Sequence, residues 1–186
     1  MNLVPARVRT AGRLLRFARD RAMGRRVPFS IAFMLTDRCN LACGYCDIPR
    51  VPSDEMSSAE FCRAISDLAA AGMVRASFSG GEALLRDDAI EIIGHARSLG
   101  LTTSLNTNGW LAESRLDRLA GLLDMIVFSL DGPRDLHDRN RGRQGSYDRV
   151  ITGIRHARTL GIPVATMTVV ADDHLNGVDH LSLIHI

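Results

Sequence analysis

The alternation of short apolar runs with helical patterns constrains the fold of this 186-residue chain more than any other feature. The runs have the length of strands, and helical patterns or polar loops separate them. Strands that alternate with helices in this way form parallel sheets with right-handed crossovers. The sequence therefore predicts an α/β fold with about five βα units. The expected strands cover residues 30–36, 74–79, 101–106, 124–130 and 162–169.

Capping and turn signals place the helices between these strands. Ser57-Ser58-Ala59-Glu60 has the form of a capping box, so we expect a helix to begin there and to stop at Gly72. The polar segment 137–142 is expected to be a loop. Further helices are expected near residues 87–99, 112–120 and 146–160.

The composition is that of an ordinary globular protein, with 46% apolar and 24% charged residues. No apolar run reaches the length of a membrane span, and the N-terminus lacks the apolar core of a secretory signal. Three of the four cysteines are clustered, which favours metal ligands in a reducing compartment over disulfides. We therefore expect a cytoplasmic protein.

The clustered cysteines, Cys39, Cys43 and Cys46, are spaced C-x3-C-x2-C directly after the first expected strand. Three thiolates from one loop suit zinc or an iron–sulfur cluster. A structural zinc site would normally have four protein ligands, and Cys62 lies sixteen residues further on, where we expect a buried core thiol. Three ligands and one vacancy favour a [4Fe–4S] cluster with one open iron. A non-catalytic zinc or iron–sulfur module is the alternative.

Polar and glycine-rich motifs follow the other expected strands. Gly80-Gly81-Glu82 ends the second strand, segment 106–109 the third and segment 129–132 the fourth. In parallel α/β folds, ligands bind at the carboxyl edge of the sheet, where all these motifs would lie. The sequence therefore predicts one ligand-binding edge shared by the cysteine loop and the three motifs.

Together, these motifs resemble those of the radical S-adenosylmethionine (SAM) superfamily over roughly residues 30–176. The cysteine loop, with Tyr45 directly before its last cysteine, is similar to the cluster loop of that family. Gly80-Gly81-Glu82 is similar to its glycine-glycine-glutamate motif. The resemblance implies a partial parallel (βα)6-type barrel, an incomplete TIM-like barrel of which about five units are present.

The resemblance also implies the cofactors and the chemistry. Cys39, Cys43 and Cys46 would hold three irons of a [4Fe–4S] cluster, and the fourth iron would bind the amine and carboxylate of SAM. Reductive cleavage of SAM would give methionine and a 5′-deoxyadenosyl radical, which takes a hydrogen atom from a substrate that the sequence does not identify. The partners implied are SAM, that substrate, and an electron donor such as flavodoxin or ferredoxin.

Several residues would surround SAM if the resemblance holds. The glycines of Gly80-Gly81-Glu82 would let the backbone approach the methionyl ammonium, and the glutamate would complement its charge. Tyr45 would lie near the adenine, and Ser129 or Asp131 near the ribose hydroxyls.

Other candidates have two interpretations each. Arg141 is either a partner of the SAM carboxylate or a solvated loop arginine. Asn106 and Asn108 are either contacts of SAM or substrate, or turn residues before a glycine. His137 is interpreted as a hydrogen-bonding loop residue rather than a general base.

Segment 129–147 most resembles the branch that includes peptide maturases and the quinone- and haem-pathway enzymes, so we expect maturation of a peptide or a cofactor precursor. The GTP-cyclising enzyme of molybdenum-cofactor synthesis shares residues 36–40 but would usually carry an arginine where this chain has Ser77. An isoprenoid-adenosylating enzyme at a membrane surface is a third alternative.

Residues 1–28 form an expected leader with a basic amphipathic helix over 3–23. Residues 1–26 hold eight arginines and one acid, a net charge of +7. We expect this helix to pack on the main domain with its arginines solvated, and a weak contact with an anionic membrane surface is the alternative. Without interleaved aromatic residues, nucleic-acid binding is not expected. The apolar stripe comprises Val4, Val8, Ala11, Leu14, Leu15, Ala18 and Ala22.

The core is expected over residues 29–180, followed by a non-native tail at 181–186. That tail, LSLIHI, matches the translation of one frame of a transposon-end sequencing adapter, CTGTCTCTTATACACATC. We therefore expect a reading frame truncated just after the fifth strand, where residues 176–178 would enter the fifth helix. A non-functional gene fragment is the remaining alternative.

Overall fold

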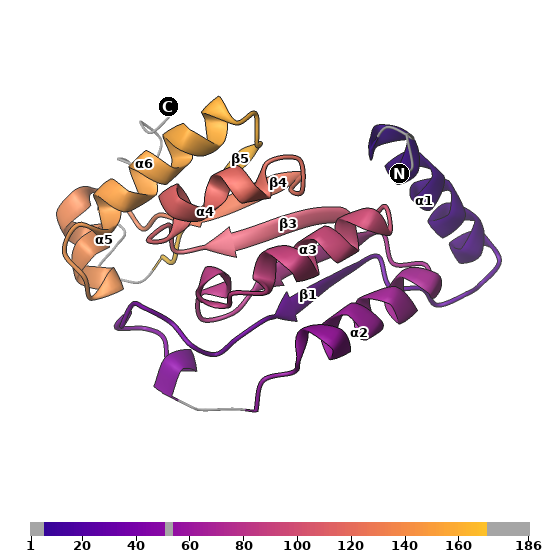
Figure 1. Ribbon diagram of the computed structural model, residues 1–186, viewed down its shortest axis with the longest axis horizontal. Coiled ribbons are helices and arrows are strands. Elements are labelled where there is room, and N and C mark those ends of the chain that lie inside the picture. Colours follow the sequence, from indigo (N-terminus) through magenta and orange to yellow (C-terminus); the bar gives the residue numbers. More distant parts are fainter. Residues whose placement is uncertain (1–5, 51–53, 171–186) are drawn as a thin grey trace.

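The computed structural model describes residues 6–50 and 54–170, and its centre is a five-stranded sheet (Figure 1). The strands lie in chain order, and every neighbouring pair is parallel. This confirms the predicted α/β fold with the architecture of a partial (βα) barrel. The expected tail at 181–186 lies outside the described residues. The strands are β1 Ser30–Met34, β2 Arg75–Ser79, β3 Thr102–Thr107, β4 Met125–Ser129 and β5 Val164–Met167.

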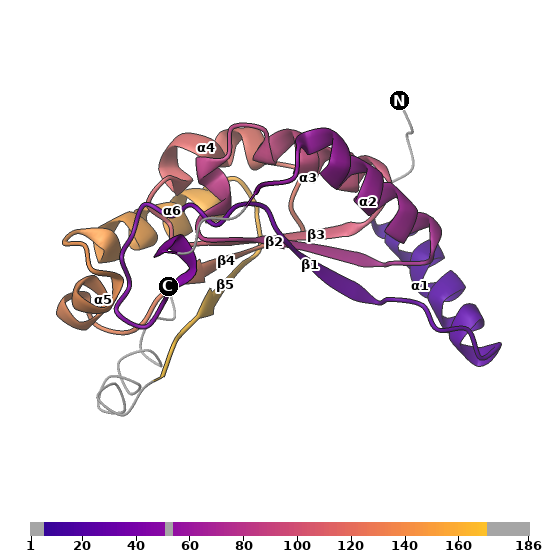
Figure 2. The ribbon, with the colours of Figure 1, turned by 90° about the horizontal axis from the view of Figure 1, so that it is seen from below.

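Helices cover one face of the curved sheet (Figure 2). The predicted capping box is present, because Ser57 Oγ accepts the Glu60 amide and the Glu60 carboxylate accepts the Ser57 amide. Over the residues described, no helix combines the length and apolar character that crossing a membrane requires. The helices are α1 Ala6–Ala22, α2 Ser58–Ala70, α3 Ala89–Ser98, α4 Ala112–Leu119, α5 Arg134–Arg141 and α6 Ser146–Thr159, with short 3-10 turns η1 Ile48–Arg50 and η2 Ala83–Leu85.

The two faces of the sheet differ in chemistry. Toward the helices, the strands place large apolar side chains such as Phe33, Phe78 and Phe128, which join the buried core. The alternate positions face the opposite side, and on β2 and β3 most of them are small and polar, whereas β4 places Met125 and Val127 there beside Ser129. These inner-face residues include Ser77, Ser79, Ser104, Asn106 and Ser129. The sheet therefore separates an apolar core from an inner face on which β2 and β3 are mainly polar.

Helix α5 corrects the prediction for segment 137–142, which was expected to be a loop. Its buried side chains are His137, Asn140 and Arg141, so the inward face of the helix is polar. Because helices are recognised in sequence by an apolar stripe, this one gave no periodic signal. The helix ends at Gly142, whose left-handed φ of 64° provides the C-cap.

Alanine substitutions at two mid-helix glycines should have opposite effects on the stability of the fold. A Cβ at Gly153 would lie 2.8 Å from Phe128 Cε1, whereas one at Gly94 would meet only Leu122 Cδ1 at 3.9 Å. Gly153→Ala should therefore lower the free energy of unfolding by about 1–3 kcal/mol. Gly94→Ala should raise it by up to about 1 kcal/mol through helix propensity. Urea unfolding of both variants under the same conditions measures this, and equal stabilities would contradict the packing described.

Candidate functional site

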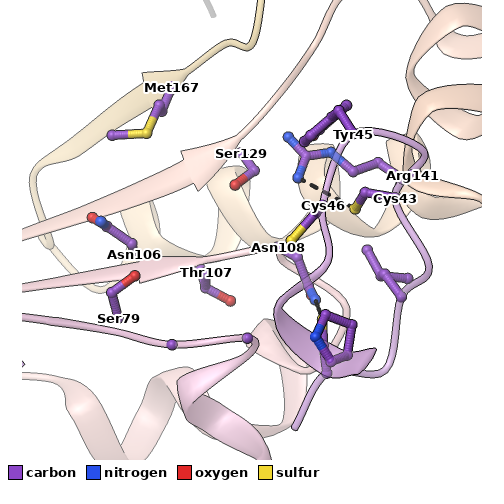
Figure 3. Close-up of a pocket in the computed structure, with 15 residues that line it drawn as sticks. Cys43, Tyr45, Cys46, Ser79, Asn106, Thr107, Asn108, Ser129, Arg141 and Met167 are labelled. Carbon is purple, nitrogen blue, oxygen red and sulfur yellow. Dashed lines mark hydrogen bonds between the residues drawn. The ribbon is translucent and has the colours of Figure 1, made fainter. Parts of the chain in front are cut away.

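A cavity lies at the carboxyl edge of the sheet, as the motif positions predicted (Figure 3). It brings together ten of the twelve residues that were predicted to contact the cluster, SAM or substrate. Glu82 and Asp131 do not line it. Ser79 and Met167 also line the cavity but were not predicted from the sequence. Both end strands on the same face of the sheet as Asn106 and Ser129, so the two-residue period of the strands could have identified them. The predicted residues that line the cavity are Cys39, Cys43, Tyr45, Cys46, Gly80, Gly81, Asn106, Asn108, Ser129 and Arg141.

The three clustered cysteines all border this cavity as free thiols, with Cys43 buried and Cys39 and Cys46 half-buried. Burial raises the pKa of Cys39. Among the described residues, no three His, Cys, Asp or Glu side chains are gathered tightly enough to hold a single metal ion. Tetrahedral zinc needs sulfur atoms about 3.8 Å apart, given its Zn–S distance. In a [4Fe–4S] cluster each thiolate binds a different iron, so an all-thiol set facing one cavity fits that group better.

Cys62 lies on α2 and does not line the cavity. It is half-buried rather than the fully buried core thiol expected, because the neighbouring residue, Phe61, takes the inward position on that helix. It is therefore separate from the three-cysteine loop.

The Gly80-Gly81 turn holds the cysteine loop through backbone contacts. The Gly81 amide donates to Thr36 O at 2.8 Å, and the Glu82 amide donates to Arg38 O at 2.9 Å. A Cβ at Gly80 would lie 2.5 Å from Thr36 O, and one at Gly81 would lie 2.4 Å from Arg38 O. Only glycine allows the two loops to approach this closely.

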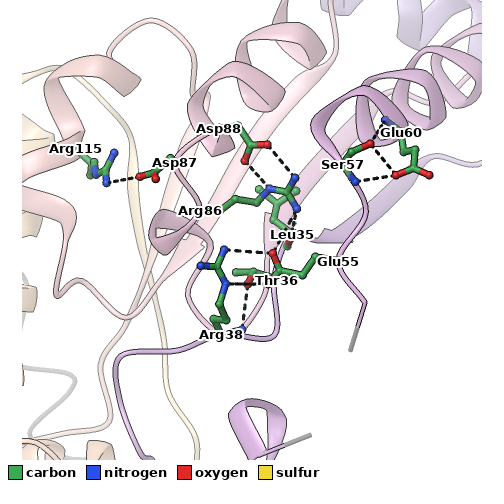
Figure 4. Close-up of polar contacts among 10 residues, drawn as sticks. All are labelled: Leu35, Thr36, Arg38, Glu55, Ser57, Glu60, Arg86, Asp87, Asp88 and Arg115. Atoms are coloured by element: carbon green, nitrogen blue, oxygen red, sulfur yellow. Dashed lines mark hydrogen bonds and ion pairs between the residues drawn. The ribbon is translucent and has the colours of Figure 1, made fainter. Parts of the chain in front are cut away.

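An ion-pair network braces the start of the cysteine loop from outside (Figure 4). Arg86 donates from Nη1 to Leu35 O at 3.0 Å, and its Nε lies 2.5 Å from Asp88 Oδ1. Glu55 accepts from the Thr36 hydroxyl and from Arg38 Nε. The hydrogen bond from Arg38 is the largest cause of a lowered pKa at Glu55.

Helix α5 holds the other side of the loop. The Gly44 amide donates to Asn140 O at 3.1 Å, and Arg143, just beyond the helix, donates to Asn40 O at 3.0 Å. A Cβ at Gly142 would lie 2.4 Å from Ala42 O. The loop is therefore clamped between the β2 turn and the end of α5.

Glu82 is 1% exposed, and its carboxylate turns away from the cavity. It accepts the Thr107 hydroxyl at 3.0 and 3.1 Å, the Asn108 amide at 2.7 Å and the Leu84 amide at 3.1 Å. Burial raises the pKa of this carboxyl group. In this arrangement Glu82 ties the β2 turn to the end of β3, and its predicted complement to the SAM ammonium stays a prediction.

Asp131 is also buried behind the cavity wall, where it organises two residues that line the cavity. It accepts from Arg141 Nη2 at 2.8 Å and from the Tyr45 hydroxyl at 3.1 Å. The Arg141 guanidinium lies 5.7 Å from the centre of the Tyr45 ring. Burial raises the pKa of Tyr45, so the phenol stays protonated. The predicted ribose contact of Asp131 stays a prediction.

Arg141 is not the solvated loop arginine that one interpretation expected. It lies on α5, is 7% exposed and faces the cavity, with Nη1 4.0 Å from Cys43 Sγ. Its Nε is buried without a hydrogen-bond partner among the described residues. A buried guanidinium with remaining donor capacity suits an anionic ligand group.

Asn108 occupies the turn position that one of its two interpretations gave it, and its contact with SAM or substrate stays a prediction. Its Oδ1 accepts the Trp110 amide at 3.0 Å, as a turn residue would. Its Nδ2 donates to Asn40 Oδ1 at 2.8 Å and lies 3.7 Å from Cys39 Sγ. Asn106 lines the cavity from β3.

His137 is a hydrogen-bonding residue, as predicted, but on α5 rather than in a loop. Its Nδ1 accepts the Asp131 amide at 3.1 Å, and the side chain is fully buried. It does not line the cavity. Burial lowers its pKa to about 4, so the ring is neutral near pH 7.

The chain matches the family model of the Radical SAM superfamily over residues 33–181. The PqqA peptide cyclase of Ruegeria pomeroyi is 36% identical over 163 residues, which cover 83% of this chain and 43% of that protein. The Fe-coproporphyrin III synthase of Methanosarcina barkeri is 34% identical over 158 residues, which cover 81% of this chain and 38% of that protein.

Among solved structures, SuiB of Streptococcus suis has a similar fold. Its complex with the precursor peptide SuiA gives a TM-score of 0.75 at 20% identity, covering 89% of this chain and 38% of that chain. Its complex with SAM gives 0.73 at 19% identity with the same coverage. This likeness shows the fold alone. The chain spans about two fifths of the length of these relatives.

The neutral, buried His137 should make the stability of the fold sensitive to acid. Between its ordinary pKa of 6.5 and its folded value of about 4, the unfolded chain binds a proton that the native chain does not. The free energy of unfolding should therefore fall by about 3 kcal/mol as the pH is lowered through that window. His137→Gln keeps a hydrogen-bond acceptor and does not titrate, so urea unfolding of this variant should show a smaller loss. Parallel pH profiles for the two proteins would contradict the assignment.

Proposed function

The chain belongs to the radical SAM superfamily, and from that premise we propose that it cleaves SAM reductively to start a hydrogen abstraction from a substrate. The observation that carries the proposal is one cavity that three cysteines share with Gly80-Gly81, Ser129 and Arg141. When bound, the cluster and SAM supply the electron, the sulfonium and the 5′-deoxyadenosyl radical. The protein supplies binding, orientation and shielding.

We assign the cluster ligands to Cys39, Cys43 and Cys46. Asn108 stands beside the first of these sulfurs and acts as a positioning residue, since hydrogen bonds to cluster sulfurs set the reduction potential. The loop that carries the thiols is fixed on both sides, so the ligands are oriented before the cluster arrives.

Around SAM, the residues divide into contacts and supports. Arg141 would pair with the carboxylate, Tyr45 would lie near the adenine, and Ser129 would lie near the ribose. Two buried acids would support these contacts from behind the cavity lining. Asp131 accepts hydrogen bonds from Arg141 and Tyr45, and Glu82 accepts the Asn108 amide at the end of β3. This supports roles as positioning residues for both acids.

For the substrate we propose a peptide or a cofactor precursor. Relatives with such names include a PqqA peptide cyclase and an Fe-coproporphyrin III synthase. Near the cavity, the inner face of the sheet carries the polar side chains of Ser79, Asn106 and Ser129, which would suit a polar substrate. No observation favours the GTP-cyclising or isoprenoid-adenosylating alternatives.

Cysteine variants test the proposal directly. After anaerobic reconstitution, Cys43→Ala should lose most of the bound iron and its visible absorbance, whereas Cys62→Ala should keep both. With reductant and SAM, the Cys62→Ala protein should release 5′-deoxyadenosine and Cys43→Ala should release none. A colourless, zinc-loaded parent chain would instead support the metal-binding module. Loss of the cluster in Cys62→Ala alone would overturn the ligand assignment.

The electron would enter through a cationic surface beside Cys39. Arg143 lies 3.5 Å above the centre of the half-buried Trp110 ring, and Arg149 lies 5.6 Å from it. The Trp110 amide donates to Asn108, which reaches Cys39 Sγ. One acidic residue, Glu113, pairs with Arg149 at 3.0 Å. An acidic flavodoxin or ferredoxin would be steered to this surface.

Charge reversal at Arg143 tests this entry route. Arg143→Glu should slow cluster reduction by flavodoxin at low salt by about tenfold. Because this variant also loses the hydrogen bond to Asn40 O, iron content and reduction by dithionite are measured in parallel to detect a change in the cluster itself. Arg149→Gln removes a charge without touching the cysteine loop and should give a smaller decrease. Arg118→Glu, an exposed site in the last turn of α4, is the matched control. Equal flavodoxin rates in all four proteins would exclude this surface.

A further inference from the structure

Helix α1 attaches to the body through arginine side chains rather than through its apolar stripe. Arg13 Nη1 donates to Met73 O at 2.9 Å and to Ala69 O at 3.2 Å, and its Nε donates to Leu99 O at 3.2 Å. Arg16 donates to Ala70 O at 2.7 Å. These carbonyls end α2 and α3 or lie just beyond them, where cations are stabilising.

A buried acid completes this attachment. Asp20 is 2% exposed and lies 3.3 Å from Arg25, 3.4 Å from Arg19 and 3.6 Å from Arg16. The Phe17 ring adds an edge contact to Phe29, at 5.1 Å between ring centres. The face of α1 that meets the body is therefore largely polar.

The apolar stripe faces outward. Leu15 is 73% exposed and Leu14 is 43% exposed. At 100° per residue, the described stripe residues fall within an arc of about 100° on the side away from Arg13 and Asp20. Its other described members, Ala11, Ala18 and Ala22, are also exposed. This orientation corrects the expectation that the helix packs with its stripe inward and its arginines solvated.

Arginines border the outward stripe on both edges. In the helical projection, Arg19 lies on one side and Arg21 on the other, and both are exposed. The only acid among residues 1–26 is the buried Asp20. The outward face therefore combines an apolar centre with a cationic border, the pattern of helices that lie in a membrane interface.

We propose that the outward face of α1 binds an anionic lipid surface. A second copy of the chain would bring two segments of net charge +7 together, which repulsion disfavours. A nucleic-acid backbone would match the arginines and leave Leu14 and Leu15 against phosphates. Lipid headgroups pair with the arginines, and the acyl region receives the leucines.

The position of α1 fixes how a bound chain would be oriented. The helix contacts residues just before β2 and β3, at the amino ends of the strands, whereas the cavity lies at their carboxyl ends (Figure 1). Lipid binding through α1 therefore turns the cavity away from the membrane. On the proposed function, the substrate then arrives from the aqueous side, unlike an isoprenoid.

Flotation with lipid vesicles tests this proposal independently of SAM chemistry. The parent chain should float with phosphatidylglycerol–phosphatidylcholine vesicles at low salt and bind pure phosphatidylcholine at least tenfold more weakly. Leu14→Gln combined with Leu15→Gln should weaken binding to the anionic vesicles at least tenfold without changing charge. Met56→Gln, at an exposed methionine outside α1, is the matched control and should bind like the parent.

Circular dichroism of each variant separates loss of binding from loss of folding. Arg19→Gln should reduce binding and its salt dependence together. Absence of flotation by the folded parent chain would overturn the proposal. Equal binding of the parent and the double-leucine variant would also overturn it, because charge alone would then account for the contact.

Discussion

The close contact between the Gly80-Gly81 turn and the cysteine loop is the constraint on which the rest of the site depends. Two backbone hydrogen bonds join the segments, and the carbonyls of Thr36 and Arg38 occupy the space that a side chain would need. On the far side, the Ala42 carbonyl meets Gly142 in the same way. Because these contacts join backbone atoms, no change of side-chain rotamer can relieve a clash there. The position of the cysteine loop relative to the strands is therefore fixed. The three thiols inherit that fixed geometry.

Behind this backbone frame lies a set of buried polar groups that join consecutive loops. Glu82 links the end of β2 to the end of β3, and Asp131 links the end of β4 to α5, Tyr45 and the Val169 amide beyond β5. Each buried acid accepts several hydrogen bonds, as a carboxylate taken out of water requires. The neutral His137 supports the Asp131 backbone in turn. The loops at the carboxyl edge are therefore coupled to one another through these buried polar groups.

Much of this arrangement could be predicted from sequence, and the failures share one cause. The strands, the capping box at Ser57 and the cavity-lining cysteines follow from local patterns that depend on near neighbours. Helix α5 was missed because its inward face is polar, and the outward stripe of α1 was misplaced because Arg13 finds helix ends that are distant in sequence. The supporting positions of Glu82 and Asp131 were missed for the same reason. In each case the side chain bonds to a partner that is distant in sequence, and such a hydrogen bond leaves no periodic pattern in the sequence.

The alternation of core and inner-face positions along the strands has a consequence for how such a domain diversifies. Ser77, Ser79 and Ser104 stand next to Ala76, Phe78 and Leu105 in the chain, yet they face opposite sides of the sheet. Exchanging an inner-face serine for a larger or charged residue reshapes the chamber and leaves the hydrophobic layer intact. Residues of the inner face and residues of the core thus alternate along each strand, so one set can be changed with little effect on the other. A library restricted to the inner positions would therefore vary the chamber on a constant scaffold.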